Sequence, residues 1–130
     1  MDTIKVYLAG GMTSNWQSKV INSFESGFTF FNPQKHNLDV SSEYTSWDLF
    51  FVKRADILFG CMEESNPSGI GLSLEVGFAK ALGLTIILVD EKSKNDSVFK
   101  NKFKIVRESA TIVYDNIDDG IAYLNSYLRI

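Results

Sequence analysis

Residues 68–89, SGIGLSLEVGFAKALGLTIILV, place a glycine-containing turn, a helix and a strand in direct succession. The helix is predicted over Leu72–Leu82 and ends at Gly83, a residue type common just after a helix. Thr85–Val89 is a continuous β-branched and apolar run, which is typical of a central parallel strand buried on both faces. This stretch therefore indicates one strand-and-helix unit of an α/β protein.

The rest of the chain continues the same alternation. Further strands are predicted at Ile4–Ala9, Phe28–Phe31, Ile57–Gly60 and Thr111–Tyr114, and further helices at 16–24, Tyr44–Ala55 and Ile117–Leu128. We expect a three-layer α/β/α sandwich, flavodoxin- or Rossmann-like, with a five-stranded parallel sheet in the order 2-1-3-4-5. No repeat or linker interrupts residues 1–130, so the chain is interpreted as a single domain.

Three segments are harder to assign. Gln34 to about Ser42 is predicted as a polar loop, and the lysine-rich stretch Asp90–Asn101 as a mobile surface excursion. Phe103–Glu108 is predicted as one helical turn or more.

Composition excludes several classes of function. A net charge of −3 disfavours nucleic acid as a partner. No segment approaches the roughly 20 apolar residues of a membrane span, and the N-terminus lacks the features of a signal peptide. Cys61 is the only cysteine, which favours a reducing, cytoplasmic setting, and His36 is the only histidine. We therefore expect no metal ion, no cofactor and no membrane contact.

Ligands of doubly wound sheets bind at the carboxyl ends of the strands, near the switch between strands 1 and 3. That rule selects Tyr7–Thr13 and Cys61–Glu75. Gly10 and Gly11 follow strand 1, where glycines let backbone N–H groups approach a ligand closely. A tight strand-to-helix turn accounts for the same two glycines.

Two carboxylates stand out near this edge. Glu75 follows the glycine turn in the first helical turns, where the helix dipole stabilises the ionised form that a nucleophile requires. The alternative is a glutamate that only complements the dipole. Asp48 lies beside Trp47 on the preceding helix, and the alternative to a functional role is an exposed helix residue. For Tyr7, the alternative is a tyrosine that only packs in the core.

Three segments together resemble the nucleoside 2-deoxyribosyltransferase family. They are KVYLAGGMTSNW (residues 5–16), WDLFFVKRADILFG (47–60) and the stretch 68–89. The resemblance implies that Glu75 attacks C1′ of 2-deoxyribose and forms a covalent glycosyl-enzyme. It implies that Asp48 protonates and holds the departing base, and that Tyr7 contacts the nucleophile or the sugar.

The same resemblance implies the substrate contacts. Gly10 matches the sugar-side turn, and Ser109 matches a residue that reaches the sugar from a neighbouring subunit, so a homo-oligomer with shared sites is expected. Trp47 and Met12 are expected to sandwich the base or to exclude water. The full set of expected binding residues is Gly10, Gly11, Met12, Trp47, Ser68, Gly69, Gly71 and Ser109.

The expected activity is cleavage of the N-glycosidic bond of a small-molecule substrate, a 2′-deoxynucleoside, with transfer of the sugar to another nucleobase. The chain departs from the transferases at Gly69, where many have a second aspartate. Its length is closer to that of the related 2-deoxynucleoside 5-phosphate N-hydrolases, but the loop GGMTSNWQSK (residues 10–19) lacks their arginine. A monophosphate N-glycosidase, or a non-catalytic nucleotide-binding module on the same fold, are the alternatives.

Overall fold

The protein is described here by a computed structural model covering residues 2–130. Five parallel strands form one sheet in the order β2-β1-β3-β4-β5, which confirms the predicted topology. The strands are β1 (Ile4–Gly10), β2 (Phe28–Phe31), β3 (Ile57–Met62), β4 (Thr85–Asp90) and β5 (Ile112–Tyr114).

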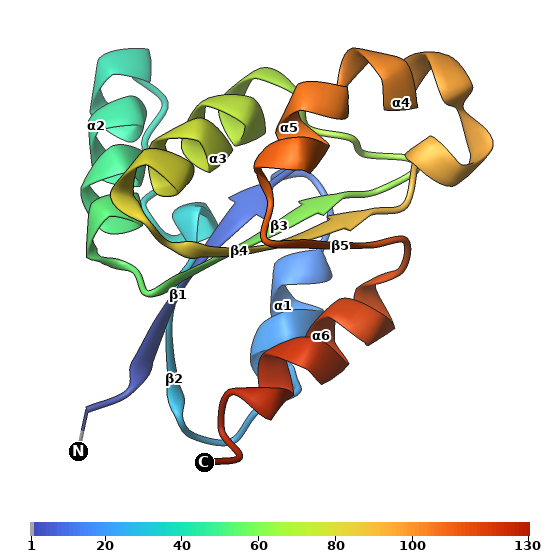
Figure 1. Cartoon of the computed structure of the whole chain (residues 1–130). Coiled ribbons are helices and arrows are strands. Elements are labelled where there is room, and N and C mark those ends of the chain that lie inside the picture. Colours follow the sequence, from blue (N-terminus) through green and yellow to red (C-terminus); the bar gives the residue numbers. More distant parts are fainter. Residues whose placement is uncertain (1) are drawn as a thin grey trace.

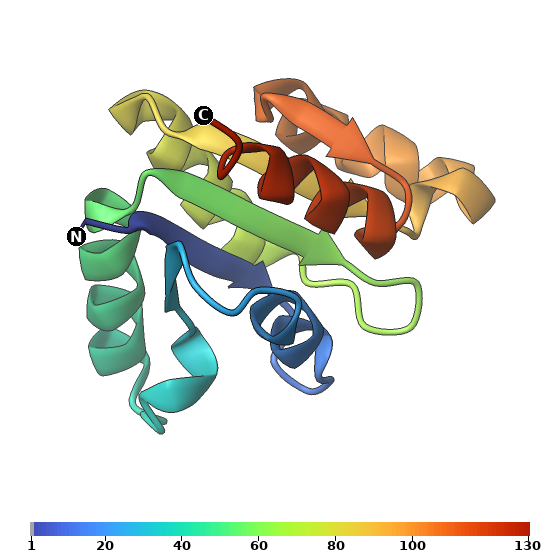
Figure 2. The same cartoon turned by 90° about the horizontal axis from the view of Figure 1, so that it is seen from below.

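Helices cover both faces of the sheet, as Figure 1 shows. One face carries α1 (Trp16–Asn22) and α6 (Ile117–Ser126), which lie in front of the strands when the molecule is seen from below (Figure 2). The other face carries α2 (Ser41–Arg54), α3 (Ile70–Leu82) and α5 (Lys104–Ser109), with the short α4 (Ser97–Lys102) beside α5. Two 3₁₀ turns, η1 (Pro33–Lys35) and η2 (Ser93–Asn95), complete the elements. No helix within residues 2–130 is both long and apolar enough to cross a membrane.

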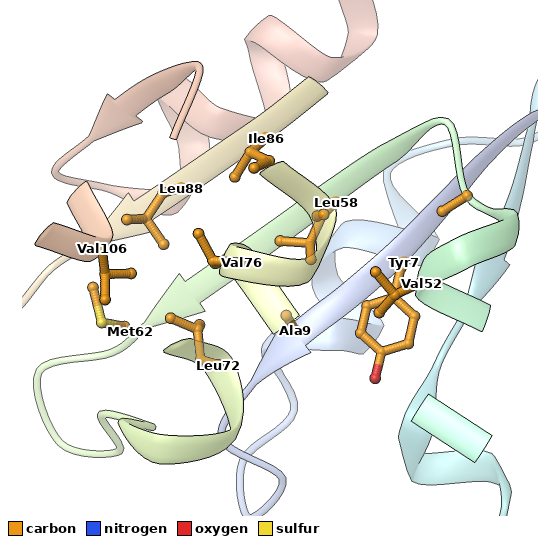
Figure 3. Packing of buried hydrophobic residues seen from close by; sticks show 12 residues of the cluster. Tyr7, Ala9, Val52, Leu58, Met62, Leu72, Val76, Ile86, Leu88 and Val106 are labelled. Carbon is orange, nitrogen blue, oxygen red and sulfur yellow. The ribbon is translucent and has the colours of Figure 1, made fainter. Parts of the chain in front are cut away.

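Each face of the sheet has its own hydrophobic core because successive side chains of a strand point to opposite sides. In β1, Val6 and Leu8 pack toward α1 and α6, whereas Tyr7 and Ala9 pack toward α2 and α3. Figure 3 shows the second of these cores, in which aliphatic side chains of β3, β4 and α3 surround one another. All six residues of β3 are buried, so the centre of the sheet is a rigid base for its carboxyl edge.

Two polar details fix how β1 lies against β3. A carboxylate oxygen of Asp56 accepts a hydrogen bond from the backbone N–H of Lys5 at 2.9 Å, which anchors the start of β1. At the other end, Gly10 pairs with Cys61 and has φ of 147°. A Cβ at Gly10 would lie 2.4 Å from the Cys61 carbonyl oxygen, so only glycine allows this close approach.

The segment Asp90–Asn101, predicted as a mobile excursion, is instead ordered into η2 and α4. Asp90 ends β4, is 1% exposed, and pairs with Arg107. Asp96 caps α4 by accepting from the N–H of Phe99 at 3.0 Å. Lys92 lies 3.5 Å from a carboxylate oxygen of Asp96, and Lys94 donates to the carbonyl oxygen of Asp115 at 3.2 Å.

The remaining boundaries differ slightly from those expected. The polar loop after β2 contains η1, and α2 begins at Ser41 rather than Tyr44. Phe103–Glu108, predicted as at least one helical turn, corresponds to α5.

Candidate active site

A cavity of about 350 Å³ opens at the carboxyl end of β1, between α2 and the start of α3. Its volume is in the range of small-molecule sites, and it lies where doubly wound sheets bind ligands. The wall combines apolar side chains, glycines and a few polar groups. The lining residues are Leu8, Gly10, Met12, Pro33, His36, Leu38, Tyr44, Asp48, Ser68, Gly71, Leu72 and Glu75.

Glu75 is placed in this wall by the second turn of α3 and is 8% exposed. The Tyr7 hydroxyl donates a hydrogen bond to Glu75 Oε2 at 2.5 Å. Tyr7 itself is fully buried in β1, and its hydroxyl oxygen turns away from the aliphatic core (Figure 3). Burial, followed by the carboxyl groups of Glu75 and Asp48, raises the pKa of Tyr7, so the phenol keeps its proton and remains a donor.

Asp48 is the second carboxyl of the cavity and comes from α2. Its Oδ1 atom is buried and has no hydrogen-bond partner among residues 2–130. The Nε2 atom of His36 lies 3.6 Å from that oxygen. Burial raises the pKa of Asp48, against the lowering effect of His36.

The carboxyl group of Asp48 affects the ionisation of Glu75. Burial raises the pKa of Glu75 to about 8, against the lowering effect of the Tyr7 hydrogen bond, and the charge of Asp48 raises it as well. Two adjacent carboxyls with raised pKa values do not both ionise readily at neutral pH. With a pKa of about 8, Glu75 is mostly protonated at neutral pH beside Asp48, so the cavity contains two neighbouring carboxyl groups that can exchange a proton.

The loop after β1 is held by its own hydrogen bonds. The carbonyl oxygen of Gly11 accepts from Trp16 Nε1 at 3.0 Å and from Gln17 Nε2 at 2.9 Å. A Cβ at Gly11 would lie 2.3 Å from the side-chain nitrogen of Asn66, so Gly11 serves the packing of the loop. Lys19, the first cation after the glycines, pairs with Asp118 on α6 at 2.9 Å.

The structure brings most of the predicted site residues together. Glu75, Asp48, Gly10, Met12, Ser68 and Gly71 line the cavity, and Tyr7 reaches it through Glu75.

Four predicted binding residues do not line the cavity in this chain. Gly11 packs against Asn66, and a Cβ at Gly69 would lie 3.0 Å from the Phe103 ring. Trp47 packs against His36, a residue of the cavity wall, with 4.9 Å between the two ring centroids. Ser109 donates to the carbonyl oxygen of Ile105 at 2.9 Å, within α5.

Sequence reasoning missed the contribution of the segment that follows β2. Pro33, His36 and Leu38 line the cavity, and so does Tyr44 from the start of α2. The sequence contained a signal for this segment, because Asn32 and Pro33 follow the carboxyl end of β2. Gly10 ends the neighbouring strand β1 at the same edge of the sheet. Residues that follow neighbouring parallel strands meet at one edge.

The described residues, 2–130, contain no group of three or more His, Cys, Asp or Glu side chains placed to hold a metal ion. The polar side chains at the cavity include the carboxyls of Asp48 and Glu75, the imidazole of His36, and the Tyr7 hydroxyl that contacts Glu75.

Fold and cavity together define a doubly wound α/β protein that holds a carboxyl pair at its topological switch point. The sequence profile of the family described as "Nucleoside 2-deoxyribosyltransferase like" matches residues 3–93. The chain belongs to this family. No curated protein matches its sequence.

Solved structures share the fold at low sequence identity. A 2-deoxyribosyltransferase from Bacillus psychrosaccharolyticus is 22% identical, with a TM-score of 0.68 over 88% of each chain. A 2-desoxiribosyltransferase from Leishmania mexicana is 14% identical, with a TM-score of 0.66 over 92% of this chain and 95% of the other. A CMP N-glycosidase from Clostridium botulinum is 20% identical, with a TM-score of 0.59 over 95% and 98%.

Proposed function

We propose that this protein cleaves the N-glycosidic bond of 2′-deoxynucleosides and transfers the deoxyribosyl group to a second nucleobase. The observation that carries the proposal is the buried Glu75 carboxyl, which receives the Tyr7 hydrogen bond and shares its cavity with Asp48. Departure of a base leaves positive charge on the sugar, and such reactions use one carboxylate at the sugar and one acid at the leaving group. Membership of the family supports the same assignment.

In the first half of the proposed reaction, the pair supplies both the nucleophile and the proton. The proton rests on the more buried Glu75 until the substrate binds, and passes to Asp48 as Glu75 ionises. Glu75 then forms a bond to C1′ while the C1′–N bond breaks, and Asp48 gives its proton to the departing ring nitrogen. The products are a neutral base, a glycosyl ester on Glu75 and an ionised Asp48.

The second half reverses these steps with another base. Its ring nitrogen bonds to C1′, its N–H proton passes to Asp48, and the Glu75 carboxylate is released. The pair again holds one proton, so the cycle closes without any other proton source. Two displacements at C1′ return the original anomer. Tyr7 assists by donating to Glu75, which favours the ionised nucleophile.

The cavity favours a nucleoside over its monophosphate. Two carboxyls line it, and its lining within the described chain includes neither lysine nor arginine. A phosphate dianion in such a cavity would meet like charge without a cationic partner. The second candidate, a 5′-monophosphate N-glycosidase, is supported by Ser68, which lies in the cavity wall two residues before α3, where a hydroxyl and helix N–H groups can bind an anion.

The test is incubation of the protein with 2′-deoxynucleosides, or with their 5′-monophosphates, in the presence and absence of a free acceptor base. We expect a new nucleoside to form when the acceptor is present, read by chromatography. Release of base from monophosphates alone, with no transfer, would favour the hydrolase. Binding of nucleosides or nucleotides without any release of base would identify a non-catalytic module.

We further propose that the protein is a homo-oligomer whose subunits contact one another across α3 and α5. Ile70 and Ile105 are 93% and 76% exposed and line one shallow hollow between these helices. Ile70 adjoins Gly71 of the catalytic cavity, and Ser109 ends the helix that carries Ile105. A second copy seated here would cover apolar surface and bring its own α5 toward a neighbouring site.

This arrangement predicts that the double substitution Ile70→Asp and Ile105→Asp shifts the protein to monomers, because two charges would have to be buried in the interface. Light scattering coupled to size-exclusion chromatography measures the change. Val98→Asp is the control, since Val98 is 77% exposed on α4 and lies outside the hollow. A wild type that is monomeric at all concentrations would refute the proposal.

A further inference from the structure

His36 is the only histidine of the chain and its side chain is 10% exposed in the wall of the cavity. The 3₁₀ turn η1 precedes it, and Asn32 caps that turn by accepting from the N–H of Gln34 at 3.1 Å. The imidazole packs against the ring of Trp47 in a T-shaped arrangement, with 4.9 Å between the ring centroids. These contacts hold the imidazole in one orientation, so its two nitrogens have distinct surroundings.

The tautomer of His36 follows from its backbone neighbour. The N–H of Leu38 points at His36 Nδ1 over a distance of 2.9 Å. A backbone N–H can only donate, so Nδ1 presents its lone pair and the proton of the neutral ring is on Nε2. Nε2 is the atom that faces Asp48 Oδ1 at 3.6 Å.

Asp48 Oδ1 needs such a donor. The atom is buried and has no hydrogen-bond partner among the described residues, which is costly for a carboxyl oxygen. The separation of 3.6 Å is slightly longer than a hydrogen bond, and contacts of this kind often tighten when substrate binds. A small movement of either side chain would satisfy the oxygen.

We infer that His36 is a positioning residue for Asp48, and this inference rests on the proposed function. With Oδ1 accepting from Nε2–H, the transferable proton of Asp48 is confined to Oδ2. That proton goes to the ring nitrogen as the C1′–N bond breaks, and the resulting carboxylate is stabilised by the same Nε2–H donor. His36 keeps its own proton throughout, so it acts through Asp48.

The kinetic test compares two leaving groups. The base of an unmodified 2′-deoxynucleoside must be protonated to leave well, whereas the base of N7-methyl-2′-deoxyguanosine already carries positive charge. His36→Phe keeps a ring against Trp47 but removes the donor. We expect it to slow release of the unmodified base by roughly 10- to 100-fold and release of the methylated base by less than about threefold.

Three further variants make the comparison specific. His36→Gln, which retains an N–H donor, is expected to recover part of the lost rate. Asp48→Asn should show the same leaving-group pattern, and adding His36→Phe to it should cost little more. Lys35→Ala, an exposed neighbour outside the cavity lining, should behave as wild type. Equal losses on both substrates in His36→Phe would show a purely structural role and overturn the inference.

An independent measurement needs no turnover. Because the chain has a single histidine, the ¹⁵N shifts of its two ring nitrogens can be assigned directly by long-range NMR. We expect the Nε2–H tautomer in the wild type and a change at Nε2 in Asp48→Asn, and a proton on Nδ1 would overturn the inference. A wild type that releases no base from either substrate would instead refute the proposed function itself.

Discussion

Replacement of Glu75 by glutamine is expected to lower kcat for base release by on the order of 10³-fold or more. The amide has no negative charge to stabilise the sugar cation and cannot form the glycosyl ester. Its oxygen can still accept from the Tyr7 hydroxyl, and its volume is nearly unchanged, so the fold should persist. Base release followed by chromatography measures the effect.

Mass spectrometry gives a second readout of the same prediction. The wild type, quenched during turnover, should carry a deoxyribosyl adduct on the peptide that contains Glu75, and Glu75→Gln should carry none. Glu64→Gln is the matched control, because Glu64 is an exposed loop residue outside the cavity. Undiminished base release by Glu75→Gln would reject the nucleophile assignment while leaving the fold assignment intact.

The second large effect concerns stability. The pKa of Glu75 is raised from its ordinary value of 4.5 to about 8, so between these pH values the native state binds more protons than the unfolded state. The associated stability is fully present below pH 4.5 and is lost as pH rises through about 8. At about 1.4 kcal/mol per pKa unit, we expect the free energy of unfolding to fall by a few kcal/mol between pH 5 and pH 9.

Urea denaturation of wild type and Glu75→Gln at pH 5, 7 and 9 measures this loss. The variant has no carboxyl to ionise at position 75, so its stability should change less with pH and should exceed that of the wild type at pH 9. The raised pKa of Asp48 acts in the same direction and leaves a smaller slope in the variant. Equal slopes for the two proteins would show that Glu75 is not a buried, coupled carboxyl.

The fold could be predicted from the sequence because the patterns that mark its strands and helices are local and recur along the chain. Thr85–Val89 is a long β-branched run, and Gly83 ends the helix before it, so both boundaries agree with the structure to within one residue. The stretch Asp90–Asn101 was misjudged because its order comes from tertiary pairing. Asp90 is held by Arg107, which lies in a different helix, and composition alone does not report such a partner.

Only part of the candidate site could be predicted from the sequence. Glu75 and Asp48 could be found because the segments that carry them resemble the family, whereas their immediate context alone also fits a helix-capping glutamate and an exposed helix aspartate. His36 could not be ranked in this way, since its importance depends on the 3.6 Å approach of Nε2 to Asp48. Gly11 and Gly69 have tight packing partners, Asn66 and Phe103, that no linear pattern reveals. The sequence therefore predicts which strand ends form the site more readily than it predicts which side chains touch one another there.

The pairing of Gly10 with Cys61 has a practical consequence. Cys61 is the chain's only thiol, it is fully buried, and it pairs across β1 and β3 with Gly10, which lines the candidate cavity. Its side chain packs on the face of the sheet that α1 and α6 cover, so a thiol-modifying reagent can reach it only when that packing opens. The rate of labelling therefore reports how often α1 and α6 expose this face of the native sheet, without any probe having to be introduced.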